Sequence, residues 1–213
     1  MAEIEKGFSL LTPELEALAD AEEKADALAR EKIDNMQVGD VIGEVTSVNI
    51  AAKKGARKKP IESGVMGVRE DFGCVDDAHA SGDWHRQISF LAEESIKKAQ
   101  NRGLSVKEGD FAENITTRGF MPFFIPIGTI LQVGGVKVEI SQIGKVCHTR
   151  CAIYYLAGDC IFPREGIFGV VLDSGDIKVG DKISVVRIGD GSCSKTPQEA
   201  IDEVEAARAA GTL

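Results

Sequence analysis

Apolar side chains alternate with polar or small ones along Val41-Ile42-Gly43-Glu44-Val45-Thr46-Ser47-Val48, residues 41–48 of the chain. A period of two is typical of a half-buried β-strand. Residues 127–140 predict a hairpin around Gly134-Gly135, a pair that two-residue primed turns favour. Residues 166–186 again predict short strands, joined by turns expected at 173–176 and 178–181. Many short strands with few intervening helices favour a barrel or a sandwich over a parallel α/β sheet.

Three helices are predicted, over residues 12–33, 89–103 and 196–211. The first begins with Thr12 as N-cap and a proline at its first position. We expect Ser89 to cap the second helix, and the capping box Thr196-Pro197-Gln198-Glu199 to start the third. The chain is therefore expected to consist of a helical N-terminal extension (1–37), a β-rich domain (38–190) and a C-terminal helix (191–213).

Composition narrows the class of protein. The chain has 213 residues, a formal net charge of -9 and a sequence pI of about 5.0, which argues against a nucleic-acid binder. The one basic run, residues 53–59, is interpreted as a solvated loop. No stretch predicts a membrane span, and residues 1–35 do not have the pattern of a secretory signal. We therefore expect a cytoplasmic protein whose five cysteines are thiols, metal ligands or redox groups.

A cluster of sulfur and basic groups is the first candidate for chemistry. Cys147 and Cys151 are four residues apart, and Cys160 follows after a probable turn. Lys145 and Arg150 lie alongside, and positive charge raises the thiolate fraction of a cysteine. Such a thiolate can attack sulfur, carry a persulfide or bind a soft metal. A structural zinc held by the three thiolates and the adjacent His148 is the competing hypothesis, although the spacing is unusual for it.

A loop rich in glycine and aspartate is the second candidate. It contains His79 and His85 near Asp77 and Asp83, which could form a metal site, an acid/base pair or a hydrogen-bonded network that fixes the loop. Arg86 is a candidate for holding an anion, because its guanidinium fork matches phosphate or carboxylate. The two cysteines outside the first cluster, at positions 74 and 193, are interpreted as buried core residues.

Taken in order, several motifs resemble the MOSC family, named for the C-terminal domain of molybdenum-cofactor sulfurase. They are Phe72-Gly73 through Asp77-Ala78-His79-Ala80, Trp84-His85-Arg86-Gln87-Ile88-Ser89, Gly109-Asp110-Phe111-Ala112-Glu113-Asn114-Ile115-Thr116, Pro126-Ile127-Gly128, Gly144-Lys145, Gly166-Ile167-Phe168 and Ile177-Lys178-Val179-Gly180-Asp181. Cys151 takes the position of the family's signature cysteine. The likeness covers about residues 38–188 and is strongest to short stand-alone bacterial members.

The resemblance implies a mainly β fold: a closed, mostly antiparallel β-barrel with flanking helices. It also implies binding of the molybdenum cofactor (molybdopterin), with Cys151 as the sulfur-carrying or molybdenum-ligating residue. The function would be cofactor sulfuration, maturation or sulfur transfer, and a catalytic role is left open. A cysteine desulfurase or a molybdoenzyme is the implied partner, and any pyridoxal phosphate would sit on that desulfurase. A homo-oligomer is also an option, whereas nucleic-acid and membrane partners are not expected.

The implied site combines both candidates. Its cofactor-binding members would be Asp77, His79, His85, Arg86, Glu113, Asn114, Lys145, Cys147, His148, Arg150 and Cys160. Two departures from the family stand out: the additional N-terminal β-barrel module of the sulfurases and amidoxime reducers is not found, and Asp76 replaces a usual glycine. The alternatives are a zinc-stabilised, non-catalytic interaction module and a molybdenum-dependent reductase of N-hydroxylated compounds.

Overall fold

The computed structural model describes residues 12–147, 155 and 160–213. The helices are α1 (Pro13–Asp34), α2 (Glu93–Asn101), α4 (Phe162–Glu165) and α5 (Gln198–Ala209), with a short 3-10 helix η1 (Pro122–Phe124). The strands are β1 (Val41–Ile50), β2 (Lys59–Pro60), β3 (Val65–Arg69), β4 (Gly73–Cys74), β5 (Ile88–Ala92), β6 (Ile115–Arg118), β7 (Ile130–Val133), β8 (Val136–Ile143), β9 (Ile167–Val171), β10 (Gly175–Lys178) and β11 (Lys182–Arg187).

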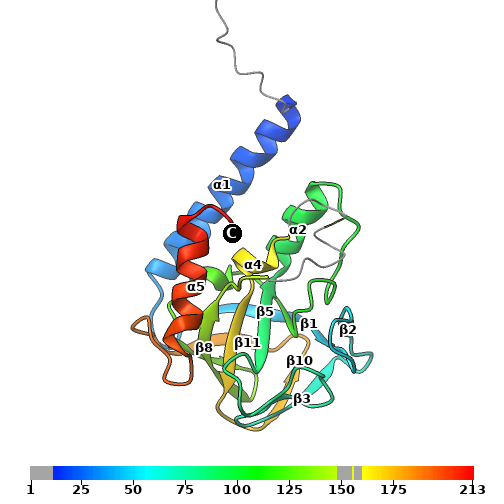
Figure 1. The fold of residues 1–213 in the computed structure, drawn as a ribbon, viewed down its shortest axis with the longest axis vertical. Coiled ribbons are helices and arrows are strands. Elements are labelled where there is room, and N and C mark those ends of the chain that lie inside the picture. The colour runs from blue at the N-terminus through cyan, green and yellow to red at the C-terminus, as the bar shows by residue number, and fades with distance from the viewer. Residues whose placement is uncertain (1–11, 148–154, 156–159) are drawn as a thin grey trace, which may run out of the picture.

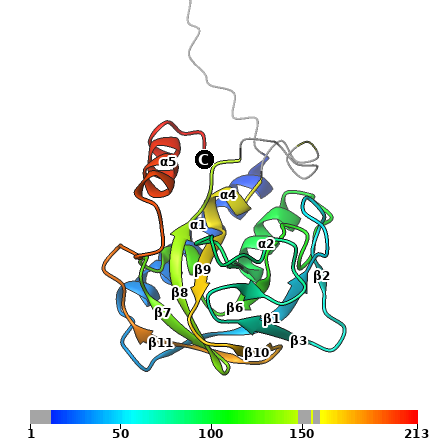
Figure 2. The same cartoon turned by 60° about the horizontal axis from the view of Figure 1, so that its bottom comes forward.

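Within the described residues, seven strands close into a barrel. Their order is β1-β11-β7-β8-β9-β5-β6, and β6 pairs again with β1. Every neighbouring pair is antiparallel except β5 and β6, which run parallel. A second sheet, β10-β3-β4, lies beside the barrel, and the helices cover the opposite end (Figures 1 and 2). The prediction of a mainly β fold with a closed, mostly antiparallel barrel and flanking helices is confirmed.

The barrel interior is filled by branched aliphatic side chains from alternating strand positions. Fully buried examples are Ile115, Leu131, Val133, Val138, Ile140, Ile167 and Ile183. Each contributes about 1.5–3 kcal/mol through removal from water. A smaller apolar cluster lies beneath α2 and α4 and includes Leu91, Ile96, Phe111, Phe162 and Phe168. That second cluster connects the helices to β5 and β9, next to the candidate site.

The strand predictions are confirmed except at one turn. Residues 41–48 lie in β1, and the predicted hairpin forms between β7 and β8. Gly134 has a φ of 56°, the positive value that primed turns require at their first central position. The turn expected at 173–176 is wrong in its second half, because β10 begins at Gly175 and pairs with β3. Ile177 is buried in the core while its neighbours in β10 are exposed, and this alternation is that of a strand and not of a turn.

The helix predictions are confirmed in position but not in every cap. Thr12 Oγ1 accepts a hydrogen bond from Leu15 N at the start of α1, as predicted. Ser89 does not cap α2, because it lies within strand β5 and the helix begins four residues later. The capping box before α5 does not form either. Thr196 Oγ1 donates instead to the carbonyl oxygen of Ser141 at 2.8 Å, which attaches this segment to β8.

Ion pairs attach α1 to the barrel through the neighbouring helices. Lys98 of α2 is buried and bonds Asp26 of α1 at 2.8 Å and Glu165 of α4 at 3.0 Å. Glu22 of α1 pairs with Arg102 at 2.7 Å. None of the described helices combines the length and apolar character needed to span a bilayer.

Candidate functional site

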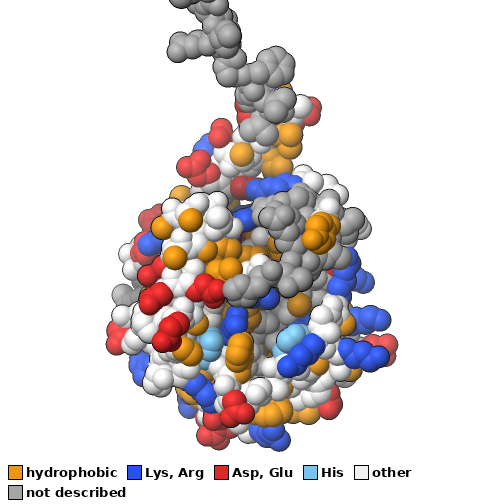
Figure 3. Space-filling model, viewed as in Figure 1, with side chains coloured by type: hydrophobic (Ala, Val, Ile, Leu, Met, Phe, Trp, Pro, Cys, Tyr) orange, Lys and Arg blue, Asp and Glu red, His pale blue; other side chains and the backbone are white. Residues whose placement is uncertain are grey.

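A cavity of about 380 Å³ lies where the loop between β4 and β5 meets the amino ends of β5 and β6. Its lining residues are Lys54, Lys58, His79, Ser81, Asp83, Trp84, Arg86, Ser89, Ala112, Asn114, Lys145, Phe162 and Phe168. The volume falls within the range of small-molecule pockets. Figure 3 shows Lys, Arg and His side chains around the hollowed middle of this face. The cavity brings together four of the predicted site residues: His79, Arg86, Asn114 and Lys145.

Positive charge dominates the cavity. Four of its lining residues are lysine or arginine, and Asp83 is the one lining carboxylate among the described residues. The chain as a whole carries a net charge of -9, so this concentration of cations is local. A low-dielectric cavity lined by one sign of charge attracts ligands of the opposite sign. The cavity is therefore suited to an anion.

Arg86 lies against two aromatic rings with part of its hydrogen-bonding capacity unused. Its guanidinium carbon lies 4.6 Å from the ring centre of Trp84 and 5.4 Å from that of Phe168. Its Nε is buried and has no hydrogen-bond partner in the described part of the chain. Burial lowers the pKa of Arg86, while electrostatic interactions with Glu203 and Cys147 act in the opposite sense. A buried donor without a partner is costly, and an anionic ligand would satisfy it.

Lys58 forms the buried floor of the cavity. Its Nζ lies 3.1 Å from Asp77 Oδ2, and both side chains are nearly fully buried, at 3% and 2% exposed. Asp77 also accepts hydrogen bonds from the backbone of Ala51 and His79, at 3.1 and 3.0 Å. Burial alone would raise the pKa of Asp77, but the hydrogen bonds from His79 and the charge of Lys58 outweigh it and hold that pKa well below its usual range.

Asn114 connects this ion pair to the strands. Its Nδ2 donates to Asp77 Oδ2 at 3.3 Å and to the carbonyl oxygen of Asn49 at 3.2 Å. Its Oδ1 accepts from the backbone N and the hydroxyl of Ser89. These bonds join the ends of β1, β5 and β6, so the position of Asp77 is fixed by the barrel itself.

Glu113 is completely buried next to this network and does not line the cavity. Its Oε1 accepts hydrogen bonds from Gly109 N at 2.5 Å and Thr116 Oγ1 at 3.1 Å. Its Oε2 has no partner among the described residues. Burial raises the pKa of Glu113 to about 7, although both hydrogen bonds and the charge of Lys58 oppose the shift. Glu113 is therefore a proton-binding group near neutral pH, close to the cavity floor.

The two histidines of the loop lie in different environments. His79 is partly exposed at the cavity, with Nδ1 3.5 Å from Asp77 Oδ1. His85 is buried, and its Nε2 lies 2.7 Å from Gln142 Oε1. The amide of Gln142 donates through Nε2 to the carbonyl oxygen of Gly144, so its Oε1 is the acceptor and His85 Nε2 carries the proton. Across the described positions no three His, Cys, Asp or Glu side chains meet to hold a metal. The geometry favours the network hypothesis for this loop.

The cysteine cluster is described only at its edges. Cys147 is exposed and lies near Arg86. Cys160 is half-buried against the apolar cluster beneath α2 and α4. His148, Arg150 and Cys151 lie outside the described residues. Cys74 and Cys193 are buried, as predicted, and burial raises the pKa of the Cys74 thiol to about 12.

Several cavity residues were not predicted from the sequence. The most important is Lys58, because the basic run 53–59 was interpreted as solvated throughout. That interpretation is wrong at this position, since residues 52–57 are exposed but Lys58 turns inward to Asp77. Trp84 and Phe168 stand in the family motifs but had no predicted site role, and Phe162 stands in none of these motifs. An acidic partner such as Asp77 can stand far away in the sequence, so spacing could not reveal the pair.

Asp76 shows why a glycine is usual at its position. Its φ is 63°, in the left-handed region that glycine adopts without strain. Asp76 is exposed and lines a separate shallow depression beside Arg69 and Phe72. Its negative charge therefore lies outside the cationic cavity.

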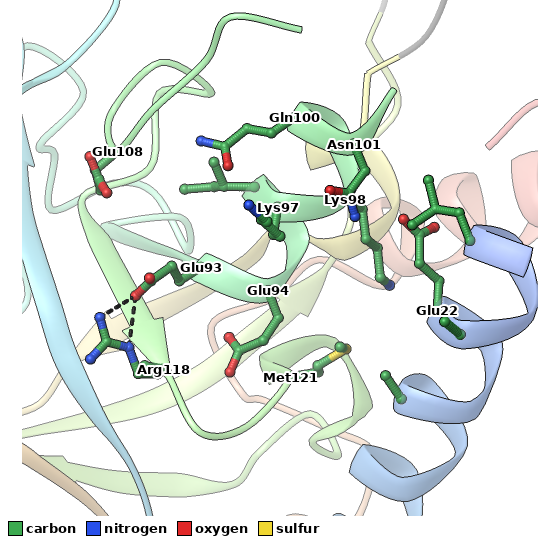
Figure 4. A pocket seen from close by; sticks show the side chains of 14 residues that line it. Glu22, Glu93, Glu94, Lys97, Lys98, Gln100, Asn101, Glu108, Arg118 and Met121 are labelled. Atoms are coloured by element: carbon green, nitrogen blue, oxygen red, sulfur yellow. Dashed lines mark hydrogen bonds and ion pairs between the residues drawn. The ribbon is translucent and has the colours of Figure 1, made fainter. Parts of the chain in front are cut away.

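A larger cavity, of about 570 Å³, lies between α1 and α2 and contains none of the predicted site residues. Apolar side chains from α1 and α2 line it, and acidic side chains form much of its rim (Figure 4). Arg118 faces Glu93 there, with Nη2 and Oε2 2.8 Å apart. The cavity with the cationic lining is the better candidate site, because its polar groups converge.

Together, the fold and the cavity define a small β-barrel domain with a cationic pocket whose walls are partly aromatic. The sequence profile of the MOSC domain matches residues 76–184, just over half of the chain. The chain therefore belongs to the MOSC domain family, which is associated with molybdenum-cofactor binding. No curated protein matches the chain at a significant level.

Solved structures agree on the fold. YiiM from Geobacillus stearothermophilus superposes with a TM-score of 0.53 at 20% identity, covering 72% of this chain and 80% of that one. YiiM from Escherichia coli gives 0.53 at 14% identity, with coverages of 80% and 93%. The YuaD protein from Bacillus subtilis gives 0.53 at 17% identity, with coverages of 67% and 94%.

Proposed function

We propose that this protein binds a molybdopterin-type cofactor in the cationic cavity. Cys151 would be the sulfur-carrying or molybdenum-ligating residue, and the protein would act in cofactor sulfuration, maturation or sulfur transfer. The observation that carries the proposal is the cavity itself, in which Lys58, Arg86 and Lys145 converge on a space of about 380 Å³. Membership of the MOSC family supports the choice of cofactor.

The described residues fit such a ligand. The unpartnered Nε of Arg86 and the ammonium groups of Lys58 and Lys145 offer charge-assisted hydrogen bonds to a phosphate. The rings of Trp84 and Phe168 give the walls apolar surface against which a planar heterocycle can pack. A bound cofactor of this class supplies an anionic phosphate, a flat pterin and a sulfur-coordinated metal.

The remaining predicted residues have supporting roles in the proposal. Asp77 and Asn114 hold Lys58 in place. Glu113 would change the charge next to Lys58 when it gains or loses its proton. His79 adds a polar group at the cavity wall. Cys147 lies near Arg86 and would be a supporting or sulfur-relay thiol. His85 is a positioning residue, since it bonds Gln142 rather than the cavity.

Analysis of the protein as isolated tests the proposal. The protein is expressed in a host that makes the cofactor, and molybdenum, pterin and protein-bound sulfane sulfur are then measured by elemental analysis, fluorescence and mass spectrometry. We expect metal and pterin to co-purify, or one added sulfur atom on Cys151. Lys145→Met should lower the pterin content severalfold, whereas Lys178→Met, an exposed lysine of β10, should not.

The cysteine assignment has its own control. Cys151→Ala should abolish the persulfide or the bound metal, whereas Cys193→Ala, a buried thiol outside the cavity, should leave both unchanged. If the wild-type protein carries neither molybdenum, pterin nor sulfane sulfur, and Cys151→Ala changes nothing, the proposal is wrong. One equivalent of zinc, lost with the fold on chelation, would favour the interaction module instead. A reductase assay on N-hydroxylated compounds with reconstituted cofactor separates the reductase from sulfur delivery.

A further inference from the structure

A basic loop borders the cationic cavity on one side. It comprises residues 52–59, which run from the end of β1 to the first residue of β2 and contain five lysine or arginine residues and no acid. Residues 52–57 are exposed, and Lys58 N donates to the carbonyl oxygen of Gly109 at 3.0 Å, which anchors the end of the loop. Figure 3 shows Lys and Arg side chains gathered at the edge of the face where β2 lies in Figure 1.

The cations of this loop form a graded series from solvent to the cavity floor. Lys53 and Lys59 are exposed and do not line the cavity, Lys54 is exposed and lines it, and Lys58 is buried at its floor. All of them come from one short segment, so the series follows from the path of the backbone.

Most of this positive charge is not neutralised locally. Arg57 lies 3.5 Å from Asp110, and Lys58 pairs with Asp77. No described acidic side chain lies within ion-pair distance of the three remaining lysines of the loop. The field at the cavity mouth is therefore positive, although the net charge of -9 would repel an anion from the molecule as a whole.

We infer that the loop 52–59 captures the phosphate-bearing ligand electrostatically and guides it into the cavity. The inference rests on the proposed function for the identity of the ligand. Exposed charges within about 10 Å of the path of a ligand raise its association rate at low salt, and this effect fades as salt screens them. Lys53 and Lys59 lie outside the cavity lining, so they should change how fast the ligand arrives and not how slowly it leaves.

Stopped-flow fluorescence with a pterin that carries one phosphate ester tests this role. The same pterin without phosphate serves as the uncharged probe. The double variant Lys53→Gln/Lys59→Gln should bind the phosphorylated probe about threefold or more slowly at low ionic strength, with an unchanged dissociation rate. The difference should vanish at about 0.5 M salt. Binding of the uncharged probe should not change.

The matched control is Lys24→Gln/Lys178→Gln, which removes two exposed lysines from α1 and β10 and gives the same net charge. It should bind the phosphorylated probe at the wild-type rate. Equal slowing in both double variants overturns the inference, because net charge alone would then explain it. A faster dissociation in the loop variant also overturns it. If the wild-type protein binds neither probe, the proposed function fails and the inference falls with it. If the wild-type protein binds the phosphorylated probe and the loop variant binds it at the same rate, only the inference is rejected.

Discussion

Replacement of Lys58 by methionine should destabilise the protein strongly, because it leaves a buried carboxylate without its cation. The side chain of Asp77 is 2% exposed, and its Oδ2 lies 3.1 Å from Lys58 Nζ. Removal of one partner from a buried ion pair costs about 3–5 kcal/mol. Asp77 keeps hydrogen bonds from Ala51 N, His79 N and Asn114 Nδ2, so we expect a loss near the lower limit, about 3 kcal/mol.

Urea denaturation at neutral pH measures this loss as a change in the free energy of unfolding. Two further variants make the result specific. Lys58→Met/Asp77→Asn removes both charges and keeps an acceptor oxygen, so it should recover to within about 1 kcal/mol of wild type. Lys59→Met, at the exposed neighbouring position, should change stability by no more than about 0.5 kcal/mol. A loss below about 1 kcal/mol in the single variant, or a double variant as unstable as the single one, would refute the reasoning.

The pH dependence gives an independent measure of the same pair. The pKa of Asp77 in the folded protein lies below its ordinary value of 3.8. The folded protein therefore holds fewer protons than the unfolded chain in this range, and the stabilisation present above about pH 4 is lost as the pH falls. Removal of Lys58 raises the pKa of Asp77, so the acid-side loss of stability should become shallower in Lys58→Met.

Three further predictions concern buried or strained positions. Glu113 has an ordinary pKa of 4.5 and a folded pKa of about 7, so wild-type stability should fall as the pH rises between these values. Glu113→Gln removes that slope, and its stability relative to wild type should rise by up to about 3 kcal/mol between about pH 4 and pH 8, measured by urea denaturation; parallel curves would contradict the shift. Gly73→Ala should cost about 3 kcal/mol in thermal unfolding, because its Cβ would meet the carbonyl oxygen of Gln87 at a position with φ of 112°. Gly180→Ala, with a φ of 91° and no atom within 4 Å, should cost only about 1 kcal/mol, and equal losses would disprove the clash. Lys98→Met removes the cation that pairs with Asp26 and Glu165, so it should cost about 3 kcal/mol of stability and speed the proteolysis of α1. Unchanged protection of α1 would show that these ion pairs do not hold the helix.

The barrel was predictable because its signals are local. Alternation marks β1, and the glycine pair at 134–135 marks the hairpin of β7 and β8, so strand identity needed no knowledge of distant contacts. The errors came where a distant contact outweighed a local preference. Ser89 suits a helix cap, but its hydroxyl and backbone N bond Asn114, which directly precedes the neighbouring strand β6, and this keeps Ser89 in β5. Thr196 similarly bonds a carbonyl of β8 in place of its own helix.

The candidate site was predictable only where its residues stand in recognisable motifs. Arg86, Asn114 and Lys145 belong to separate motifs, and the fold brings them to one cavity. The basic run does not show which of its lysines is buried, because the lysines are chemically identical. Only the folded structure shows that Lys58 is the one that pairs with Asp77. The burial that raises the pKa of Glu113 likewise depends on side chains packed from several strands.

The single parallel pair of strands follows from parity. In a closed ring of strands, directions can alternate all the way round only if the number of strands is even. This ring has seven, so at least one neighbouring pair must point the same way, and β5 with β6 is that pair. Two strands with a shared direction begin at the same end of the barrel. The segment that leads into β5 carries Arg86 and the segment that leads into β6 carries Asn114, so the odd strand count itself delivers these two motifs to one opening.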